Sequence, residues 1–261
     1  MRAGSVLGFV LLLVADGAHG GAWTLDRHKL AIFAGVTAST AALRYDNSGT
    51  PSKHIVFNKL LIQDWMEYGL TDTVTVFAAP EYVLAQSDMG GTGAATIRSE
   101  SVEAGLRILL LTKLGMLSLQ VSGKSAGAFD MSVSSSGEAG RQFEARLLWG
   151  RSFKLLRRDA YVDVEVAKRW IAPPRPDELA FEATAGWHVT PRNLVLVQSF
   201  NFMTFGAVKP PYQPYELSKL EFSLVLRLSP RWSLQSGYFL SLTGRNIVKE
   251  TGVIGTIWFQ T

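Results

Sequence analysis

Residues 55–84, IVFNKLLIQDWMEYGLTDTVTVFAAPEYVL, contain two runs of alternating side chains on either side of a turn, Gly69-Leu70-Thr71-Asp72. Similar turns recur about every forty residues, each between runs of the same kind. They are Leu111-Thr112-Lys113-Leu114, His188-Val189-Thr190-Pro191, Leu228-Ser229-Pro230-Arg231 and, more loosely, Leu156-Arg157-Arg158-Asp159. The repeated order of strand, tight turn, strand and longer loop predicts an all-β fold, an antiparallel up-and-down β-barrel that spans a membrane.

Period-two alternation between the turns predicts about twelve strands in this barrel. The expected strands are 30–43, 55–68, 73–84, 98–110, 116–122, 141–150, 161–170, 179–186, 194–205, 217–228, 232–242 and 252–259. The longest expected loop covers 123–140, and another covers 87–96. An even number of strands, with short turns at one end and longer loops at the other, is typical of bacterial outer-membrane barrels.

The main alternative is a soluble periplasmic β-sandwich or barrel, whose strands would also alternate. Strands of soluble proteins are usually about five or six residues long, and most of the runs here are longer. Aromatic side chains also lie near the ends of the expected strands, as in the aromatic belts at membrane interfaces. These residues are Tyr68, Trp149, Trp170, Trp187, Trp232 and Phe259. Both features favour the membrane barrel.

The N-terminal residues have the features of a secretory signal peptide. Arg2 is positively charged, residues 6–15 are apolar, and small residues surround Gly20. We therefore predict a signal peptide over 1–20 and an outer-membrane barrel over 21–261, with cleavage after Ala22 as the alternative. An uncleaved membrane anchor is less consistent with the apolar run, which is shorter than the ~20 residues of a spanning helix.

The composition is consistent with this architecture and excludes some functions. Apolar residues make up 47% of the chain and the mean hydropathy is +0.13, as expected when strands place alternate side chains against lipid. The chain has no cysteine, so disulfides and thiolate metal sites are excluded. The formal charge is +4, but lysine and arginine are scattered along the chain, so we expect no nucleic-acid partner.

The charged residues of the alternating strands are expected to face the lumen, because a charge facing hydrocarbon costs a few kcal/mol. The predicted lumen-facing residues are Glu67, Glu103, Arg107, Glu144, Arg146, Asp163, Glu165, Arg169, Glu182, Lys219, Glu221 and Arg227. Their signs are mixed. Mixed signs favour ion pairs between neighbouring strands over a selective pore, in which one sign usually dominates.

Three polar residues conflict with this assignment of faces. Asn58 and Asp64 lie on the face assigned to lipid, and Gln198 does not fit the alternation of its strand. A β-bulge or an error in the expected register would account for them.

Catalytic and cofactor signals are weak. After the signal peptide the only histidines are His28, His54 and His188, and none has the spacing of a metal site or of a serine-histidine hydrolase. Gly90-Gly91-Thr92-Gly93 lacks the Lys-Ser/Thr of a phosphate-binding loop and is expected to be a flexible outer loop. We predict no catalytic residue, no metal and no cofactor.

Two motifs resemble a known group of proteins. Gly21-Ala22-Trp23-Thr24 and the later Glu67-Tyr68-Gly69-Leu70-Thr71-Asp72 resemble the XagA-like family of poorly characterised bacterial outer-membrane barrels. The chain is also generally similar to barrels that transport compounds during aromatic degradation. The resemblance implies the location and the architecture, and carries over no catalytic residue.

The sequence therefore predicts a barrel of the Gram-negative outer membrane that acts as a narrow passive channel. A non-conducting structural or surface-interaction barrel is the first alternative, and a lipid-modifying enzyme is the second. The expected partners are outer-membrane lipid, the barrel-assembly machinery and, for a channel, a small solute.

Overall fold

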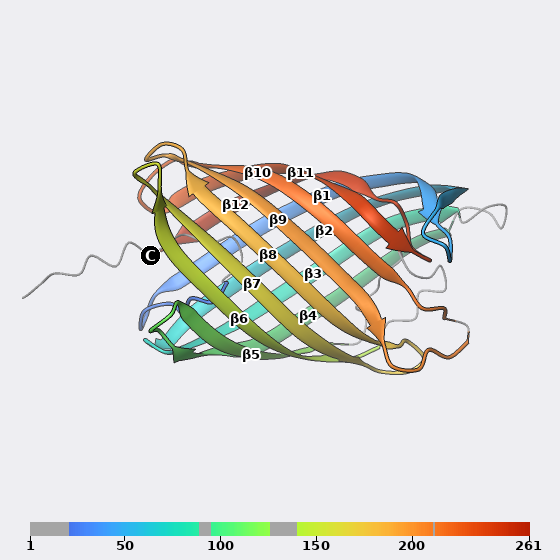
Figure 1. Cartoon of the computed structure of the whole chain (residues 1–261), viewed down its shortest axis with the longest axis horizontal. Helices are drawn as coiled ribbons and strands as arrows, with labels where there is room; N and C mark the ends of the chain where they lie inside the picture. The colour runs from blue at the N-terminus through green and yellow to red at the C-terminus, as the bar shows by residue number, and fades with distance from the viewer. Residues whose placement is uncertain (1–20, 89–94, 126–139, 211) are drawn as a thin grey trace, which may run out of the picture.

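The computed structural model describes residues 21–88, 95–125, 140–210 and 212–261. Twelve antiparallel strands form a closed barrel in which each strand pairs with its neighbours in the sequence and β1 pairs with β12 (Figure 1). The strands are β1 (Leu30–Tyr45), β2 (Pro51–Thr71), β3 (Val74–Asp88), β4 (Ala95–Leu111), β5 (Met116–Lys124), β6 (Gln142–Leu155), β7 (Arg158–Ile171), β8 (Asp177–His188), β9 (Asn193–Phe205), β10 (Glu216–Arg227), β11 (Trp232–Arg245) and β12 (Thr251–Gln260). The predicted fold class is confirmed.

Several strands extend further than the sequence predicted. β2 begins at Pro51 rather than at 55, and β3 continues to Asp88 rather than ending at 84. The polar side chains in these extensions hid the strands from an analysis of apolar alternation, although their backbone pairing continues. The segments 89–94 and 126–139, which include most of the predicted outer loops and Gly90-Gly91-Thr92-Gly93, lie outside the described residues, as does the predicted signal peptide. Among the residues described, no helix is long and apolar enough to cross a membrane.

The two ends of the barrel differ in their connections. The turns after β2, β4, β6, β8 and β10 are short and lie at the end that holds the C terminus (Figure 1). We call this the inner end, and the opposite end, with the longer connections, the outer end. The strands are strongly tilted to the barrel axis (Figure 1), as closure of a sheet into a barrel requires.

The outward face is apolar and carries the predicted aromatic residues. Val102, Leu147 and Val166, for example, remain about half exposed, because nothing in the protein covers this face. Near the inner end Trp232 and Phe259 are in contact, with ring centroids 4.8 Å apart. Towards the outer end Phe143 and Trp170 form a similar pair, with centroids 5.5 Å apart. Aromatic residues at both rims of an apolar band match the membrane interfaces of a spanning barrel.

The three conflicting polar residues do not share one explanation. Asn58 is exposed on the outward face. Asp64 lies on the same face, between the exposed side chains of Ile62 and Met66, so both residues have the outward orientation that the sequence predicted. Gln198, in contrast, faces the lumen, where it is 3% exposed and donates to Thr184 Oγ1 at 3.2 Å. Neither a β-bulge nor a shift of register is involved, because β9 pairs regularly with both neighbours; Leu194 and Leu196 also face the lumen and obscure the alternation.

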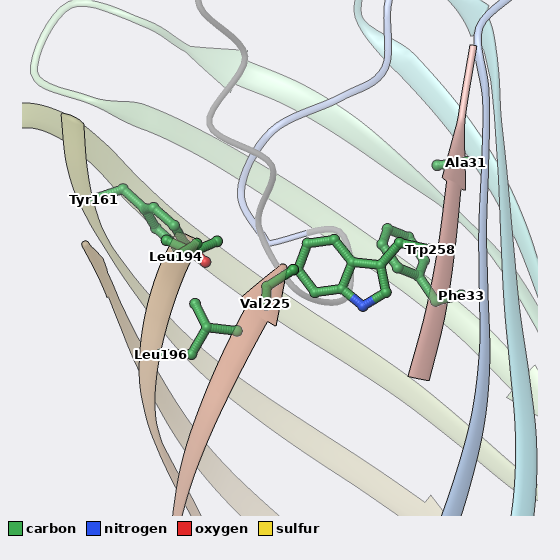
Figure 2. Packing of buried hydrophobic residues seen from close by; sticks show 7 residues of the cluster. All are labelled: Ala31, Phe33, Tyr161, Leu194, Leu196, Val225 and Trp258. Atoms are coloured by element: carbon green, nitrogen blue, oxygen red, sulfur yellow. The ribbon is translucent and has the colours of Figure 1, made fainter. Parts of the chain in front are cut away.

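The lumen of the inner end contains an apolar core. Its buried members come from β1, β7, β9, β10 and β12, and they point towards one another (Figure 2). They are Ala31, Phe33, Tyr161, Leu194, Leu196, Val225 and Trp258. The indole of Trp258 contacts Phe33 edge to face, with centroids 5.3 Å apart. Apolar side chains therefore lie on both faces of the wall here, and they close much of the inner lumen.

Candidate functional site

The N-terminal segment, residues 21–29, folds into the inner end of the lumen and adds to this core. The backbone N–H of Ala22 donates to Asp163 Oδ2 at 2.8 Å, and that of Leu25 donates to Thr75 Oγ1 at 2.8 Å. Trp23 contacts Tyr161 edge to face, with centroids 5.7 Å apart. The sequence offered no expectation for this segment beyond a lead into the first strand, although the apolar lumen-facing residues of β1, β9 and β12 were a signal that something packs there.

A buried polar layer lies next to the N-terminal segment, on the side that faces the outer end. Arg107 is 1% exposed, and its guanidinium donates to Glu67 at 2.9 Å, to Gln120 at 3.0 Å and to the carbonyl oxygen of Trp23 at 3.0 Å. Trp65 donates its Nε1–H to the same Glu67 carboxylate at 2.8 Å. Arg107 thus joins three elements, β2, β5 and the N-terminal segment, through one planar group.

Beyond this layer the lumen contains a cavity of 420 Å³. Its cationic lining consists of Lys59, Arg107, Lys124, Arg146, Arg169, Arg175 and Lys219. Its anionic lining consists of Glu81, Glu103, Glu144, Glu165, Glu178 and Glu182. Seven positive groups and six negative groups give a nearly neutral lining in which both signs are present.

One side of the cavity, formed by β6, β7 and β8, carries a connected set of ion pairs. Arg146 contacts Glu144 at 2.7 Å and Glu182 at 3.0 Å, and it also pairs with Glu165. Arg169 contacts the same Glu144 at 2.6 Å and Glu182 at 3.5 Å. Two arginines shared among several carboxylates, all held by paired strands, give a rigid charged wall.

Two cations of the cavity lining, Lys59 on β2 and Lys219 on β10, contact the connection between β11 and β12, which turns into the lumen. Ile247 and Val248 are fully buried, and Glu250 forms ion pairs with Lys59, at 2.6 Å, and with Lys219. Burial alone would raise the pKa of the Glu250 carboxyl, but the two lysines outweigh burial and hold the pKa well below its usual value.

A second connection, between β9 and β10, contacts the cavity lining at Glu178 and Arg175 through Tyr215. The Tyr215 hydroxyl donates to Glu178 at 2.5 Å, and Arg175 contacts the same carboxylate at 3.0 Å. Burial, together with the Glu178 charge, raises the pKa of the Tyr215 hydroxyl well above its usual value, so it stays protonated and can donate.

The predicted lumen residues occupy three levels. Glu67, Arg107, Asp163 and Glu221 are buried in the inner half, and of these Arg107 also reaches the cavity. Glu103, Glu144, Arg146, Glu165, Arg169, Glu182 and Lys219 line the cavity. Arg227 lies on the lumen-facing side of β10 but is exposed at the inner rim, beside a small pocket that includes His188.

The sequence prediction missed several members of the site. Lys59 lies on the same face of β2 as the predicted Glu67, and Glu178 lies on the same face of β8 as Glu182, because an even number of residues separates each pair. Counting every second residue along these strands would have identified both. Glu250 and Tyr215 lie in connections between strands, where alternation gives no information.

The histidines are widely separated. His28 Nδ1 is 2.8 Å from the Tyr68 hydroxyl at the inner end, and His188 is the last residue of β8 at the same end. His54 lies near the start of β2, at the outer end, and so at the opposite end of the barrel from His188. Within the described part of the chain, no group of three side chains could hold a metal ion.

Comparison with known proteins gives matches of structure only. No protein-family model matches the chain, and no curated protein matches its sequence. Among solved structures, an outer-membrane channel from Pseudomonas putida F1 has a TM-score of 0.67 at 13% identity, over 94% of this chain and all of that chain. The fold is that of outer-membrane β-barrels.

Two further barrels have the same fold. The translocator domain of the autotransporter NalP from Neisseria meningitidis has a TM-score of 0.56 at 10% identity, over 95% of this chain and 91% of that chain. The NanC porin has a TM-score of 0.51 at 10% identity, over 89% of this chain and 100% of that chain. At these identities the similarity establishes the fold and no activity. The resemblance to the XagA-like family stays a prediction.

Proposed function

We propose that the protein is a narrow passive channel of the outer membrane that admits small polar solutes. The observation that supports this most strongly is the 420 Å³ cavity in the lumen, lined by charged side chains from β2 to β8 and from β10. A charged lining of this kind can replace part of the hydration shell of a polar solute. Export by the signal peptide, insertion by the barrel-assembly machinery and a surrounding shell of lipid belong to the same proposal.

The charge pattern of the cavity suggests which solutes would pass. Seven cations and six anions in the lining produce no large potential of one sign. Neighbouring positive and negative groups instead match solutes that carry both charges, or neutral solutes with several hydrogen-bonding groups. We therefore expect weak ion selectivity and a preference for small zwitterionic or neutral polar solutes.

A specific observation favours a second candidate, a barrel that does not conduct. The N-terminal segment and the apolar core occupy the inner end, and Arg107 and Glu67 are almost fully buried between them and the cavity. If this closure is permanent, the cavity is a dead end that is accessible from one side, and the protein has a structural or surface-interaction role.

Planar-bilayer recording of the refolded protein separates the two candidates. Folding is first verified by the shift in gel mobility on heating, and the same preparation is then added to the bilayer. We expect discrete conductance steps with weak selectivity. A folded preparation that never conducts would exclude the channel and support the structural barrel.

Two charge variants locate the pathway of the ions. Glu182 and Lys124 both line the cavity, and their side chains are 23% and 19% exposed, so each can be neutralised with little disturbance of the fold. Glu182→Gln should shift the reversal potential towards anion selectivity, and Lys124→Gln should shift it towards cation selectivity. Shifts in opposite directions are expected only if ions pass through this cavity.

A further inference from the structure

Asp163 is a buried carboxylate for which the described residues offer no ion pair. It lies on β7 at the inner end, 3% exposed, and accepts a hydrogen bond from the backbone N–H of Ala22 at 2.8 Å. Its carboxyl group is also hydrogen-bonded to the neighbouring carboxyl group of Glu165, and Arg107 attracts it from a greater distance. No lysine, arginine or histidine of the described residues is within salt-bridge distance of it. Two buried carboxyl groups side by side cannot both carry a charge without a large cost unless a cation lies beside them.

The backbone of Gly21 lies directly against this carboxylate. A Cβ atom at position 21 would be 3.0 Å from Asp163 Oδ2 and 3.2 Å from its Cγ, and the φ angle of Gly21 is +23°. Across the ladder from Asp163, Gly150 leaves the space that Trp23 fills, since a Cβ there would lie 2.6 Å from the Trp23 ring. The site therefore accommodates glycine at positions 21 and 150, and it brings the start of the N-terminal segment onto Asp163.

We propose that the chain is cut between Gly20 and Gly21 during export and that the α-ammonium group of Gly21 becomes the ion-pair partner of Asp163. In the cleavage, water adds across the peptide bond, leaving a carboxylate on Gly20 and an amine, protonated at neutral pH, on Gly21. That ammonium group can rotate about the Cα–C bond of a glycine towards the carboxylate. Processing thus supplies the missing positive charge at the place where the charge is needed.

The packing of Ala22 distinguishes this cut from the alternative after Ala22. Ala22 is fully buried, its N–H donates to Asp163 and its carbonyl oxygen accepts from the Ser118 hydroxyl at 2.5 Å. A chain beginning at Trp23 would lose both bonds and would leave Asp163 further from any donor. Cleavage before Gly21 keeps them and adds the ion pair, which fastens residues 21–29 in the lumen. This inference holds whether or not the lumen conducts.

The intact mass of the protein purified from outer membranes is the first test. A mass corresponding to a chain that begins at Gly21 is expected. A chain that begins at Trp23, or one that retains residues 1–20, would overturn the proposal.

The ion pair itself is tested with two refolded chains, one beginning at Gly21 and one with a single alanine before Gly21. The extension leaves every barrel residue unchanged but displaces the ammonium group from Asp163. We expect it to lower the temperature at which the folded gel band is lost by about 5 °C. Equal temperatures for the two chains would refute the pairing.

Two carboxylate variants show where the effect of the extension arises. In Asp163→Asn the extension should make no further difference, because the amide carries no charge to pair with the N terminus. Glu221→Gln is the matched control, since Glu221 is also a buried lumenal carboxylate but is hydrogen-bonded to Ser223. In this control the extension should still lower the temperature by the same amount, and loss of the effect there would contradict a specific role of Asp163.

Discussion

Individual buried charges are the main points at which this barrel is sensitive to substitution. Arg107 satisfies its donors with Glu67, Gln120 and the Trp23 carbonyl oxygen, and both it and Glu67 are nearly inaccessible to solvent. Removing one member of a buried pair leaves the other charge without a partner, and that charge cannot recover its hydration. The cost of a substitution is therefore set by the charge that remains.

Arg107→Met is expected to lower the free energy of unfolding by about 3–5 kcal/mol, because Glu67 is left buried without its cation. The measurement is urea unfolding of the refolded protein in detergent. Adding Glu67→Gln to Arg107→Met should restore part of the loss, since the uncompensated charge is then removed. A double variant no more stable than Arg107→Met alone would show that the packing of the arginine, and not its charge, is what matters.

At the scale of structural elements, the connection between β11 and β12 is held in the lumen by backbone hydrogen bonds to β1 and by one carboxylate. Glu250 is 1% exposed and contacts both Lys59 and Lys219, so its folded pKa is lower than its unfolded value. A depressed pKa stabilises the folded form fully above the unfolded pKa, and this contribution is lost as the pH falls through the folded pKa. The connection should thus stay docked in mild acid, down to pH values well below the usual carboxylate range.

Glu250→Gln should release this connection at neutral pH, because the two lysines then have no carboxylate to hold. Amide hydrogen exchange of residues 246–250 should become at least about tenfold faster in the variant, as expected for a loss of over 1.4 kcal/mol. Glu216→Gln is the control, since Glu216 makes only an exposed pair with Arg245 at 3.6 Å and such pairs contribute little. Unchanged exchange in Glu250→Gln would mean that the apolar contacts of Ile247 and Val248, together with the backbone hydrogen bonds to β1, hold the connection without the carboxylate.

For the whole molecule, the dominant constraint is that one face of the wall meets lipid and the other meets a polar lumen. Leu147 and Gln142 lie on the same strand, β6, with Leu147 exposed on the outward face and Gln142 lining the cavity. Leu147→Arg should destabilise the barrel by about 2–4 kcal/mol in lipid bilayers, because the charge is placed in hydrocarbon. Gln142→Arg should cost less than half as much. Unfolding in vesicles measures both, and equal costs would contradict the assignment of the faces.

The sequence by itself determined the number of strands, the closed antiparallel order and the face on which most charges lie. These features follow from the alternation of side chains and from the turn residues, which are local properties of the sequence. The alternation along a strand indicates which residues lie on each of its two faces, whatever its neighbours are. Gln198 did not fit the expected alternation because apolar residues also line the lumen beside it, a situation that exists only once several strands meet at the inner end.

Only the tertiary structure determined what fills the lumen. The contact between Ala22 and Asp163 joins residues 141 positions apart, and Glu250 meets Lys59 and Lys219 from a connection with no alternating pattern. Such contacts depend on the closure of the barrel, which brings distant strands around one axis and turns the N-terminal segment and the β11–β12 connection inward. The pattern along a strand specifies which side chains point into the lumen, but their partners are set by the three-dimensional packing.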